Sequence, residues 1–313
     1  KQLSLENPGV VQTAFGSVAA DSEPMNRSAP HTKNSEDNPF GPEEQRLADM
    51  AVEYLGREKI ISLDTIVGDG KDGISARFII PKQHAHIAYG LKLLFDEPAP
   101  RIVRKPTYTI IYFTDEAFAQ NRGRKLLDKD ITVRLMMGHK RGEQVKICRN
   151  TVYLGEGKKG IFHFENWRVK AIDKTGLFLH AGARRDTLSL HDPAGEKDVF
   201  REVVSAVSGL TATGKTTTLC RSFSENPGEF SEMIGDDGGA VGCDGSYAAF
   251  EMGGLYVKTE GLDETQPEIL KAVETEDAYL ENVAIKGDLL TPDFNDIQKT
   301  GNGRAIITRN NLR

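Results

Sequence analysis

Apolar residues recur every three or four positions along residues 42–56, PEEQRLADMAVEYLG, and this spacing predicts a helix with one buried face. Glu43 and Glu44 suit the first turn of that helix, and Gly56 suits its end. A second helix is predicted over residues 83–95. Short runs rich in branched and aromatic residues predict strands over residues 59–68, 74–81, 108–114 and 131–138. The first half of the chain is therefore expected to be mixed α/β.

The strand-like pattern restarts at about residue 174. The runs with this character cover residues 176–182, 201–210, 248–259 and 305–309. A loop rich in Gly and Thr follows the second run, so we expect a β-rich unit built around that loop. The sequence thus predicts a mixed α/β (α+β) chain with one domain over residues 1–173 and another over residues 174–313.

Composition narrows the possible partners and the compartment. The 313 residues carry a net charge of -6, which argues against a surface built to bind nucleic acid or an anionic membrane. The N-terminus has no signal-peptide pattern, and no apolar stretch reaches the roughly 18 residues of a membrane span. Three separated cysteines without a CxxC pair suggest neither disulfides nor zinc. We expect buried thiols in a cytoplasmic protein.

Residues 207–219, VSGLTATGKTTTL, contain the clearest motif of the chain. Gly209 to Thr216 fits GxxxxGK[ST] at each fixed position, after a strand-like run and before a segment that can open a helix. Backbone N–H groups and a helix N-terminus stabilise phosphate oxygens in such loops. The alternative is a glycine turn with an exposed lysine. The predicted nucleotide-binding residues of the loop are Gly209, Leu210, Thr211, Ala212, Thr213, Gly214, Lys215, Thr216 and Thr217.

The motif assigns roles to two side chains and requires an acidic residue that helps to hold the metal ion. Lys215 is expected to reach the β- and γ-phosphates, and the Thr216 hydroxyl to ligate the magnesium ion that accompanies the nucleotide. Asp236 and Asp237 follow a short apolar stretch, and adjacent carboxylates are favoured beside a divalent cation. The alternative for this Asp-Asp-Gly-Gly segment is a tight acidic turn in solvent.

Further motifs surround the loop in a fixed order. The segment YLGEGKKGIF places Tyr153, Lys158 and Lys159 beside glycines, and His180 follows at the end of an apolar run. Together with the P-loop and the paired aspartates, this order resembles the ATP-dependent phosphoenolpyruvate carboxykinase family, in which a glycine-rich loop carries the tyrosine and the lysines. Later segments that resemble family motifs are FEMGGLYVKT with Lys258, AYLENV with Glu281 and KTGNGRAIIT with Arg304.

The resemblance, continuous from about residue 25, implies a fold and a set of ligands. It implies an N-terminal substrate domain and a P-loop mononucleotide-binding domain that is incomplete at its C-terminus. Lys159, His180 and Asp237 would be the ligands of a manganese ion, with Asp236 available beside them. A neutral lysine ligand requires a lowered pKa, which burial and a neighbouring cation would provide. Taken alone, His180 would be a hydrogen-bonded core histidine, and the paired lysines would form a solvated loop.

The same resemblance assigns the remaining side chains. Arg27, Tyr153, Lys158, Lys159 and Arg304 would bind substrate; Lys159, Lys215, Lys258 and Arg304 would be catalytic; Lys258, Glu281 and Arg304 would also contact the nucleotide. Arg27 lies within residues 21–46, which are rich in Ser, Pro, Asn and Glu and predict an exposed loop.

The implied reaction converts oxaloacetate and ATP to phosphoenolpyruvate, ADP and CO2, as in gluconeogenesis, with Mn2+ and Mg2+ as cofactors. The expected partners are these small molecules alone, with no nucleic acid, no membrane and a monomeric chain. Alternatives are a P-loop kinase with another acceptor and a non-catalytic nucleotide-binding relative. Departures from the family pattern include Ala212 in place of a glycine, Gly-Gly-Ala after Asp237, and a long link over residues 184–203. The family's C-terminal part, which forms the adenine pocket, is missing, so we expect a fragment.

Overall fold

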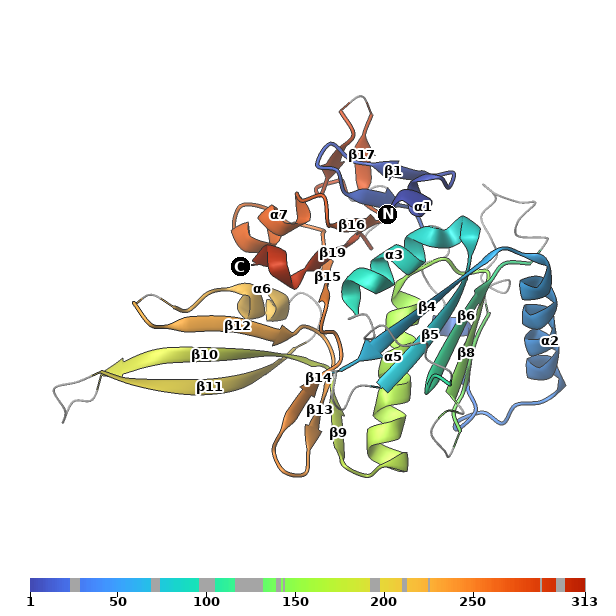
Figure 1. The fold of residues 1–313 in the computed structure, drawn as a ribbon, viewed down its shortest axis with the longest axis horizontal. Helices are drawn as coiled ribbons and strands as arrows, with labels where there is room; N and C mark the ends of the chain where they lie inside the picture. The colour runs from blue at the N-terminus through green and yellow to red at the C-terminus, as the bar shows by residue number, and fades with distance from the viewer. Residues whose placement is uncertain are drawn as a thin grey trace.

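A six-stranded mixed sheet forms the right-hand part of the molecule in Figure 1. The computed structural model describes residues 1–22, 29–68, 74–95, 105–115, 132–138, 142, 144–191, 198–209, 213–224, 226–287, 289–296 and 302–312. The order of the strands is β3 (Thr32–Asn34), β7 (Thr132–Met136), β8 (Gln144–Arg149), β6 (Tyr108–Phe113), β5 (Ile74–Pro81) and β4 (Ile60–Val67).

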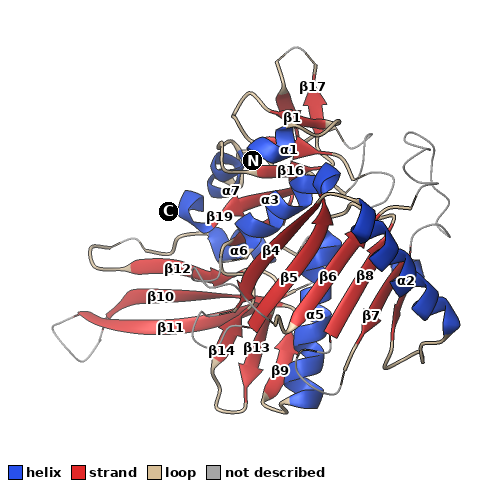
Figure 2. Cartoon of the chain, turned by 45° about the vertical axis from the view of Figure 1, so that its right-hand side comes forward, coloured by secondary structure: helices blue, strands red, loops and turns tan. Residues whose placement is uncertain are grey.

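Helices cover both faces of this sheet, as the turned view of Figure 2 shows. The helix α2 (Pro42–Arg57) packs on one face through Leu47 and Ala51, which contact Phe113 and Ile147. The helices α3 (Ala85–Leu94) and α5 (Gly155–Trp167) pack on the opposite face, where Phe164 and Ile110 belong to the main core. Both faces are buried, so β5 alternates only between buried and half-buried positions.

A five-stranded sheet joins the two ends of the described chain. Its order is β1 (Val10–Gln12), β2 (Val18–Ala20), β16 (Tyr279–Glu281), β19 (Arg304–Thr308) and β15 (Gly254–Lys258). The strand β2 pairs in parallel with β16, although they lie at opposite ends of the sequence. A domain boundary at residue 173 stays a prediction, and this pairing places strands from both sides of that boundary in one sheet.

The P-loop follows the edge strand of a three-stranded sheet. That sheet has the order β11 (Asp198–Ser208), β10 (Ala181–His191) and β12 (Phe230–Gly235), with α6 (Lys215–Cys220) beside it. A second three-stranded sheet has the order β14 (Tyr247–Ala249), β13 (Gly239–Gly242) and β9 (Gly176–Leu179). The smaller elements are α1 (Gln2–Leu5), α7 (Pro267–Val273), β17 (Ala284–Lys286), β18 (Thr291–Asp293), a π-helical turn (Arg168–Ile172) and short 3-10 turns (Ala29–His31, Lys82–His84, Arg309–Leu312).

The elements with a regular apolar period agree with the sequence prediction, and several other features differ from it. The helix α2 is confirmed, but β3 lies inside the segment predicted to be an exposed loop. The glycine-rich segment predicted to be a loop is the start of helix α5. Cys148 is buried as expected, whereas Cys243 is exposed because it lies in the turn between β13 and β14. No helix in the described part of the chain is long and apolar enough to span a membrane.

Candidate active site

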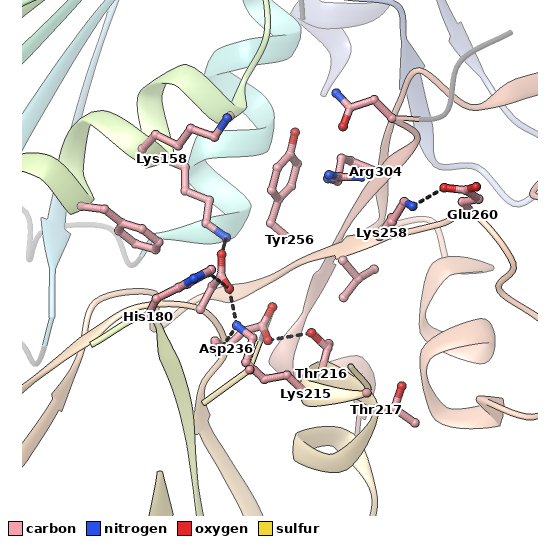
Figure 3. A pocket seen from close by; sticks show the side chains of 18 of the residues that line it. Lys158, His180, Lys215, Thr216, Thr217, Asp236, Tyr256, Lys258, Glu260 and Arg304 are labelled. Carbon is pink, nitrogen blue, oxygen red and sulfur yellow. Dashed lines mark hydrogen bonds and ion pairs between the residues drawn. The ribbon is translucent and has the colours of Figure 1, made fainter. Parts of the chain in front are cut away.

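A cavity of about 1360 Å³ lies where α5, α6 and the sheet of β15 and β19 meet. Figure 3 shows Lys158 and His180 on one wall, Arg304 and Lys258 on the opposite wall, and Lys215, Thr216 and Asp236 below them. The structure therefore brings motifs that are far apart in the sequence to one place. The predicted site residues that line it are Tyr153, Lys158, Lys159, His180, Gly209, Gly214, Lys215, Thr216, Thr217, Asp236, Asp237, Lys258 and Arg304.

The remaining predicted site residues do not line this cavity among the described residues. Thr213 and Glu281 are described but are not among the residues that line the cavity. Arg27, Leu210, Thr211 and Ala212 lie outside the described residues, so their predicted roles stay predictions.

The P-loop helix supplies the lower part of the cavity. Gly214 is the N-cap of α6 with φ of 83°, a conformation that favours glycine, and Lys215 and Thr216 are the first two residues of the helix. The Thr216 hydroxyl donates to Asp236 Oδ1 at 3.0 Å. Lys215 Nζ donates to the backbone oxygen of Asp236 at 3.3 Å and forms an ion pair with Asp237. The loop is thus coupled directly to the aspartate pair.

Asp237 lies at the centre of the charged groups. Its carboxylate pairs with Lys158 at 3.0 Å and with Nε2 of His180 at 2.8 Å, besides its pair with Lys215. Burial would raise the pKa of Asp237, but the charges of Lys158 and Lys215 outweigh this and hold that pKa well below its usual range. Asp236 differs: burial raises its pKa, and Lys158 offsets only part of the effect. Asp237 is therefore the carboxylate that stays charged, and its oxygens are paired with Lys158, His180 and Lys215.

The two neighbouring lysines of α5 have different surroundings. The Lys158 side chain is only 4% exposed and lies between Asp237 and Glu251, with Nζ at 3.0 Å from both carboxylates. Burial alone would lower the pKa of Lys158, but these two carboxylates raise it. Lys159 is exposed to the cavity, with Nζ 5.4 Å from the centre of the Tyr153 ring. Desolvation of its amine lowers the pKa of Lys159, and the nearby Lys146 and Arg304 add to the effect.

Glu251 is a charged residue of this region that the sequence did not single out. It is fully buried, and burial raises its pKa to about 7 although Lys158 opposes the shift. In the segment FEMGGLYVKT, the resemblance assigns a role to Lys258 alone. The sequence signal for Glu251 is a lone glutamate inside an apolar run. Such a residue is rarely buried without a charged partner, so it indicates a buried ion pair.

The opposite wall carries a row of charged side chains across three strands. Glu281, Arg304 and Lys258 are cross-strand neighbours on β16, β19 and β15, so their side chains share one face of the sheet. Lys258 pairs with Glu260. Glu281 is fully buried and accepts hydrogen bonds from Leu154 N at 2.9 Å and from the Tyr256 hydroxyl. These hydrogen bonds connect the start of α5 with strands β15 and β16. The nucleotide contact of Glu281 stays a prediction.

The donors in the cavity fit a divalent cation. Among the described residues, no three His, Cys, Asp or Glu side chains gather in a metal-binding arrangement. The predicted ligands Lys159, His180 and Asp237 all line the cavity, and their role in holding a metal ion stays a prediction. The His180 side chain is 54% exposed and faces Asp237, so it is not a core histidine. Imidazole, amine and carboxylate donors can all ligate divalent first-row metal ions.

The charge of the cavity suits a polyanion. Among the described residues that line it, five are Lys or Arg and three are Asp or Glu, whereas the chain as a whole has a net charge of -6. A concave site with an excess of positive charge attracts anionic ligands. Phosphate and carboxylate groups are therefore the ligands that this arrangement favours.

Comparison with known proteins agrees with the motifs and the geometry. The chain matches the family model of phosphoenolpyruvate carboxykinase over residues 33–313. It is similar to phosphoenolpyruvate carboxykinase (ATP) of Neurospora crassa, with 30% identity over 274 residues, 85% of this chain and 40% of the relative. It is also similar to phosphoenolpyruvate carboxykinase (ATP) 2 of Salinibacter ruber, with 27% identity over 96% of this chain and 53% of the relative. The chain spans about half the length of these relatives or less. It belongs to the family of ATP-dependent phosphoenolpyruvate carboxykinases.

Proposed function

We propose that this chain carries the metal, substrate and phosphate sites of an enzyme that converts oxaloacetate and ATP to phosphoenolpyruvate, ADP and CO2. The observation that carries the proposal is the single cavity lined by Lys215 of the P-loop, by Asp237 and by Arg304. A P-loop alone is common to many proteins, but this one opens beside a histidine, a lysine of lowered pKa and a carboxylate held in its charged form.

The P-loop residues are proposed to hold the nucleotide. Backbone N–H groups at the start of α6 would bind phosphate oxygens, and the Lys215 ammonium would reach the β- and γ-phosphates once it leaves Asp237. Thr216 and Asp236, which contact each other at 3.0 Å, would hold the magnesium ion of the nucleotide.

The metal ligands are proposed to be Lys159, His180 and Asp237. The lowered pKa of Lys159 favours the neutral amine that coordination requires, and the Asp237 carboxylate is already charged. A manganese ion bound there would supply Lewis-acid stabilisation of substrate oxygens.

The substrate is proposed to lie between this ligand set and the wall of β15 and β19. Arg304, with Tyr153 and Arg27, would orient the carboxylates of oxaloacetate, because a guanidinium pairs with planar oxyanions through two hydrogen bonds. Loss of CO2 breaks the bond to the departing carboxylate and leaves its electron pair on the enolate of pyruvate. The enolate oxygen then attacks the γ-phosphorus and releases ADP, while Lys215, Lys258 and Arg304 neutralise the transferring group.

The proposed setting is the cytoplasm, with phosphoenolpyruvate formation as the direction of the reaction. Three free cysteines in a sequence without CxxC suit a reducing compartment. A monomer is the proposed form.

Lys215→Met tests the reaction class in the complete protein. Phosphoenolpyruvate formation should fall by about a thousandfold or more, because a single electrostatic contact to the transition state contributes about 4 kcal/mol in comparable sites. Decarboxylation of oxaloacetate to pyruvate should fall far less, since it needs no phosphate acceptor. Both products are followed with and without ATP. A variant that still makes phosphoenolpyruvate near the unmodified rate would show that the loop does not hold the phosphates.

A further inference from the structure

A buried arginine lies at the C-terminal end of the P-loop helix. Arg184 belongs to β10 and is only 2% exposed. Its Nε and Nη2 donate to both carboxylate oxygens of Asp186, at 2.7 and 2.6 Å. Its Nη1 donates to the backbone oxygens of Thr218 and Arg221, at 2.5 and 2.6 Å. The guanidinium also stacks on the Phe223 ring, with Cζ 4.0 Å from the centre of the ring.

These hydrogen bonds stabilise the C-terminal end of helix α6. The helix has six residues, and helices of this length are unstable unless other parts of the fold hold them. Its last carbonyl groups have no partner inside the helix, and they carry the negative end of the helix dipole. A cation that donates to Thr218 and Arg221 satisfies two carbonyls and lies at the favourable end of the dipole.

The same strand also packs closely against the helix. Leu219 of α6 is 2% exposed and packs over Gly182 of β10. A Cβ at Gly182 would lie 2.1 Å from Leu219 Cδ1 and 2.1 Å from the backbone oxygen of Asp236. The strand therefore contacts the helix at two positions, one by close packing and one through the guanidinium of Arg184.

We propose that Arg184 is a positioning residue for the phosphate site. It joins the buried carboxylate of Asp186 to the end of α6 and so fixes the helix whose first residues are Lys215 and Thr216. A displacement of the helix would move both side chains, and errors of about 1 Å in such groups can cost on the order of a hundredfold in rate. This inference rests on the proposed function for the identity of the nucleotide.

An arginine suits this role better than a lysine. The guanidinium forms a planar fork that can bind a carboxylate on one side and carbonyl groups on the other. An ammonium group lacks this fork and would have to serve Asp186, Thr218 and Arg221 from one nitrogen atom. Arg184→Lys should therefore recover only part of what Arg184→Met loses.

The test compares ATP binding and hydrogen exchange in matched variants of the complete protein. Arg184→Met should weaken Mg-ATP binding at least about tenfold in calorimetric titrations. Amide hydrogen exchange over residues 215–221 should become faster without nucleotide. The double variant Arg184→Met, Asp186→Asn removes both charges of the buried pair. It is measured in place of the single variant if Arg184→Met does not fold. Arg77→Met is the control, because Arg77 makes a similar two-bond pair with Asp64 on the sheet of β4 and β5.

The possible outcomes separate this inference from the proposed function. ATP affinity that falls in the Arg184 variants but not in Arg77→Met supports a positioning role. Equal ATP affinity in all variants overturns the role and leaves the proposed function intact. If the unmodified complete protein binds no ATP, the proposed function fails, and hydrogen exchange then decides the role of Arg184. Unchanged exchange over residues 215–221 in Arg184→Met overturns the role, and faster exchange confined to that segment supports it.

Discussion

Lys158 Nζ lies 3.0 Å from Oδ2 of Asp237, the carboxylate proposed to bind the metal. A metal ion at Asp237 would compete with this ammonium, because both need the same lone pairs. Lys158 also lies 3.0 Å from the fully buried carboxylate of Glu251. Glu251 can therefore keep Lys158 paired while Asp237 turns to the metal.

Glu251→Gln should weaken Mn2+ binding by about tenfold to a hundredfold, the range found when outer partners of metal ligands are removed. Without Glu251, Lys158 pairs with Asp237 alone and competes more strongly. Electron paramagnetic resonance titration of free Mn2+ at pH 8 measures the effect. Adding Lys158→Met to this variant should restore much of the affinity, because the competitor is gone.

The control for this pair is Glu165→Gln, which changes another buried glutamate, paired with Arg168 outside the cavity. Its Mn2+ affinity should match that of the unmodified protein. If the double variant binds Mn2+ no better than Glu251→Gln, competition by Lys158 is not the cause.

His180→Ala should abolish manganese-dependent decarboxylation of oxaloacetate and leave nucleotide binding largely intact. The imidazole is 54% exposed, so its loss removes a ligand without opening a cavity in the core, and the thermal midpoint should change little. Mn2+ titration, ATP titration and thermal unfolding are measured on one preparation. His163→Ala removes a second histidine of the same cavity and should keep Mn2+ binding. Equal loss of ATP binding in His180→Ala would indicate a structural histidine.

Elements with a clear apolar period could be predicted from the sequence, and elements with interrupted periods could not. The helix α2 was found because one face is apolar and glutamates occupy its first turn. The strand β8 was missed because Lys146 interrupts its apolar pattern, although Lys146 is buried and paired with Glu156 at 2.9 Å. A buried ion pair hides a strand from a hydrophobicity pattern.

The helix α5 was missed for a different reason. Glycines at 155, 157 and 160 lower the intrinsic helix propensity, so the segment looked like a loop. In the fold they permit close contact: a Cβ at Gly157 would meet Tyr112 and Leu91, and one at Gly160 would meet Lys146. Tertiary packing thus outweighs local propensity here. The order of motifs indicated about half of the residues that line the cavity, among them all five of its Lys and Arg side chains. Glu251 acquires its partner Lys158 only when the chain folds.

The unfolding free energy should depend on Glu281 between about pH 4.5 and pH 7. Burial raises the pKa of Glu281 to about 7, although bonds from Leu154 and Tyr256 oppose the shift. The native state therefore favours the protonated form. The stability from this group is fully present below the unfolded pKa of about 4.5 and is lost as pH rises through 7, on the order of 3 kcal/mol.

Glu281→Gln keeps an oxygen acceptor and removes the titration, so the unfolding free energy should fall less steeply over that range. Denaturant unfolding at pH 5, 6, 7 and 8 measures the slope. Glu251→Gln should also make the unfolding free energy fall less steeply over this pH range, since burial also raises the pKa of Glu251 to about 7. A Glu281→Gln curve parallel to that of the unmodified protein would contradict a raised pKa.

Gly182→Ala and Gly56→Ala should change stability in opposite directions. A Cβ at Gly182 would lie 2.1 Å from the backbone oxygen of Asp236, and that oxygen cannot move away without shifting the aspartate pair. Overpacking of this kind costs about 1–3 kcal/mol of unfolding free energy, and ATP affinity should fall with it because α6 rests on Gly182. At Gly56, inside α2, a Cβ would meet nothing within 4 Å, so alanine should stabilise the helix by about 0.5–1 kcal/mol. Denaturant unfolding and ATP titration of both variants measure the contrast. A Gly182→Ala protein with unchanged stability and unchanged ATP affinity would mean that the P-loop helix does not depend on this contact.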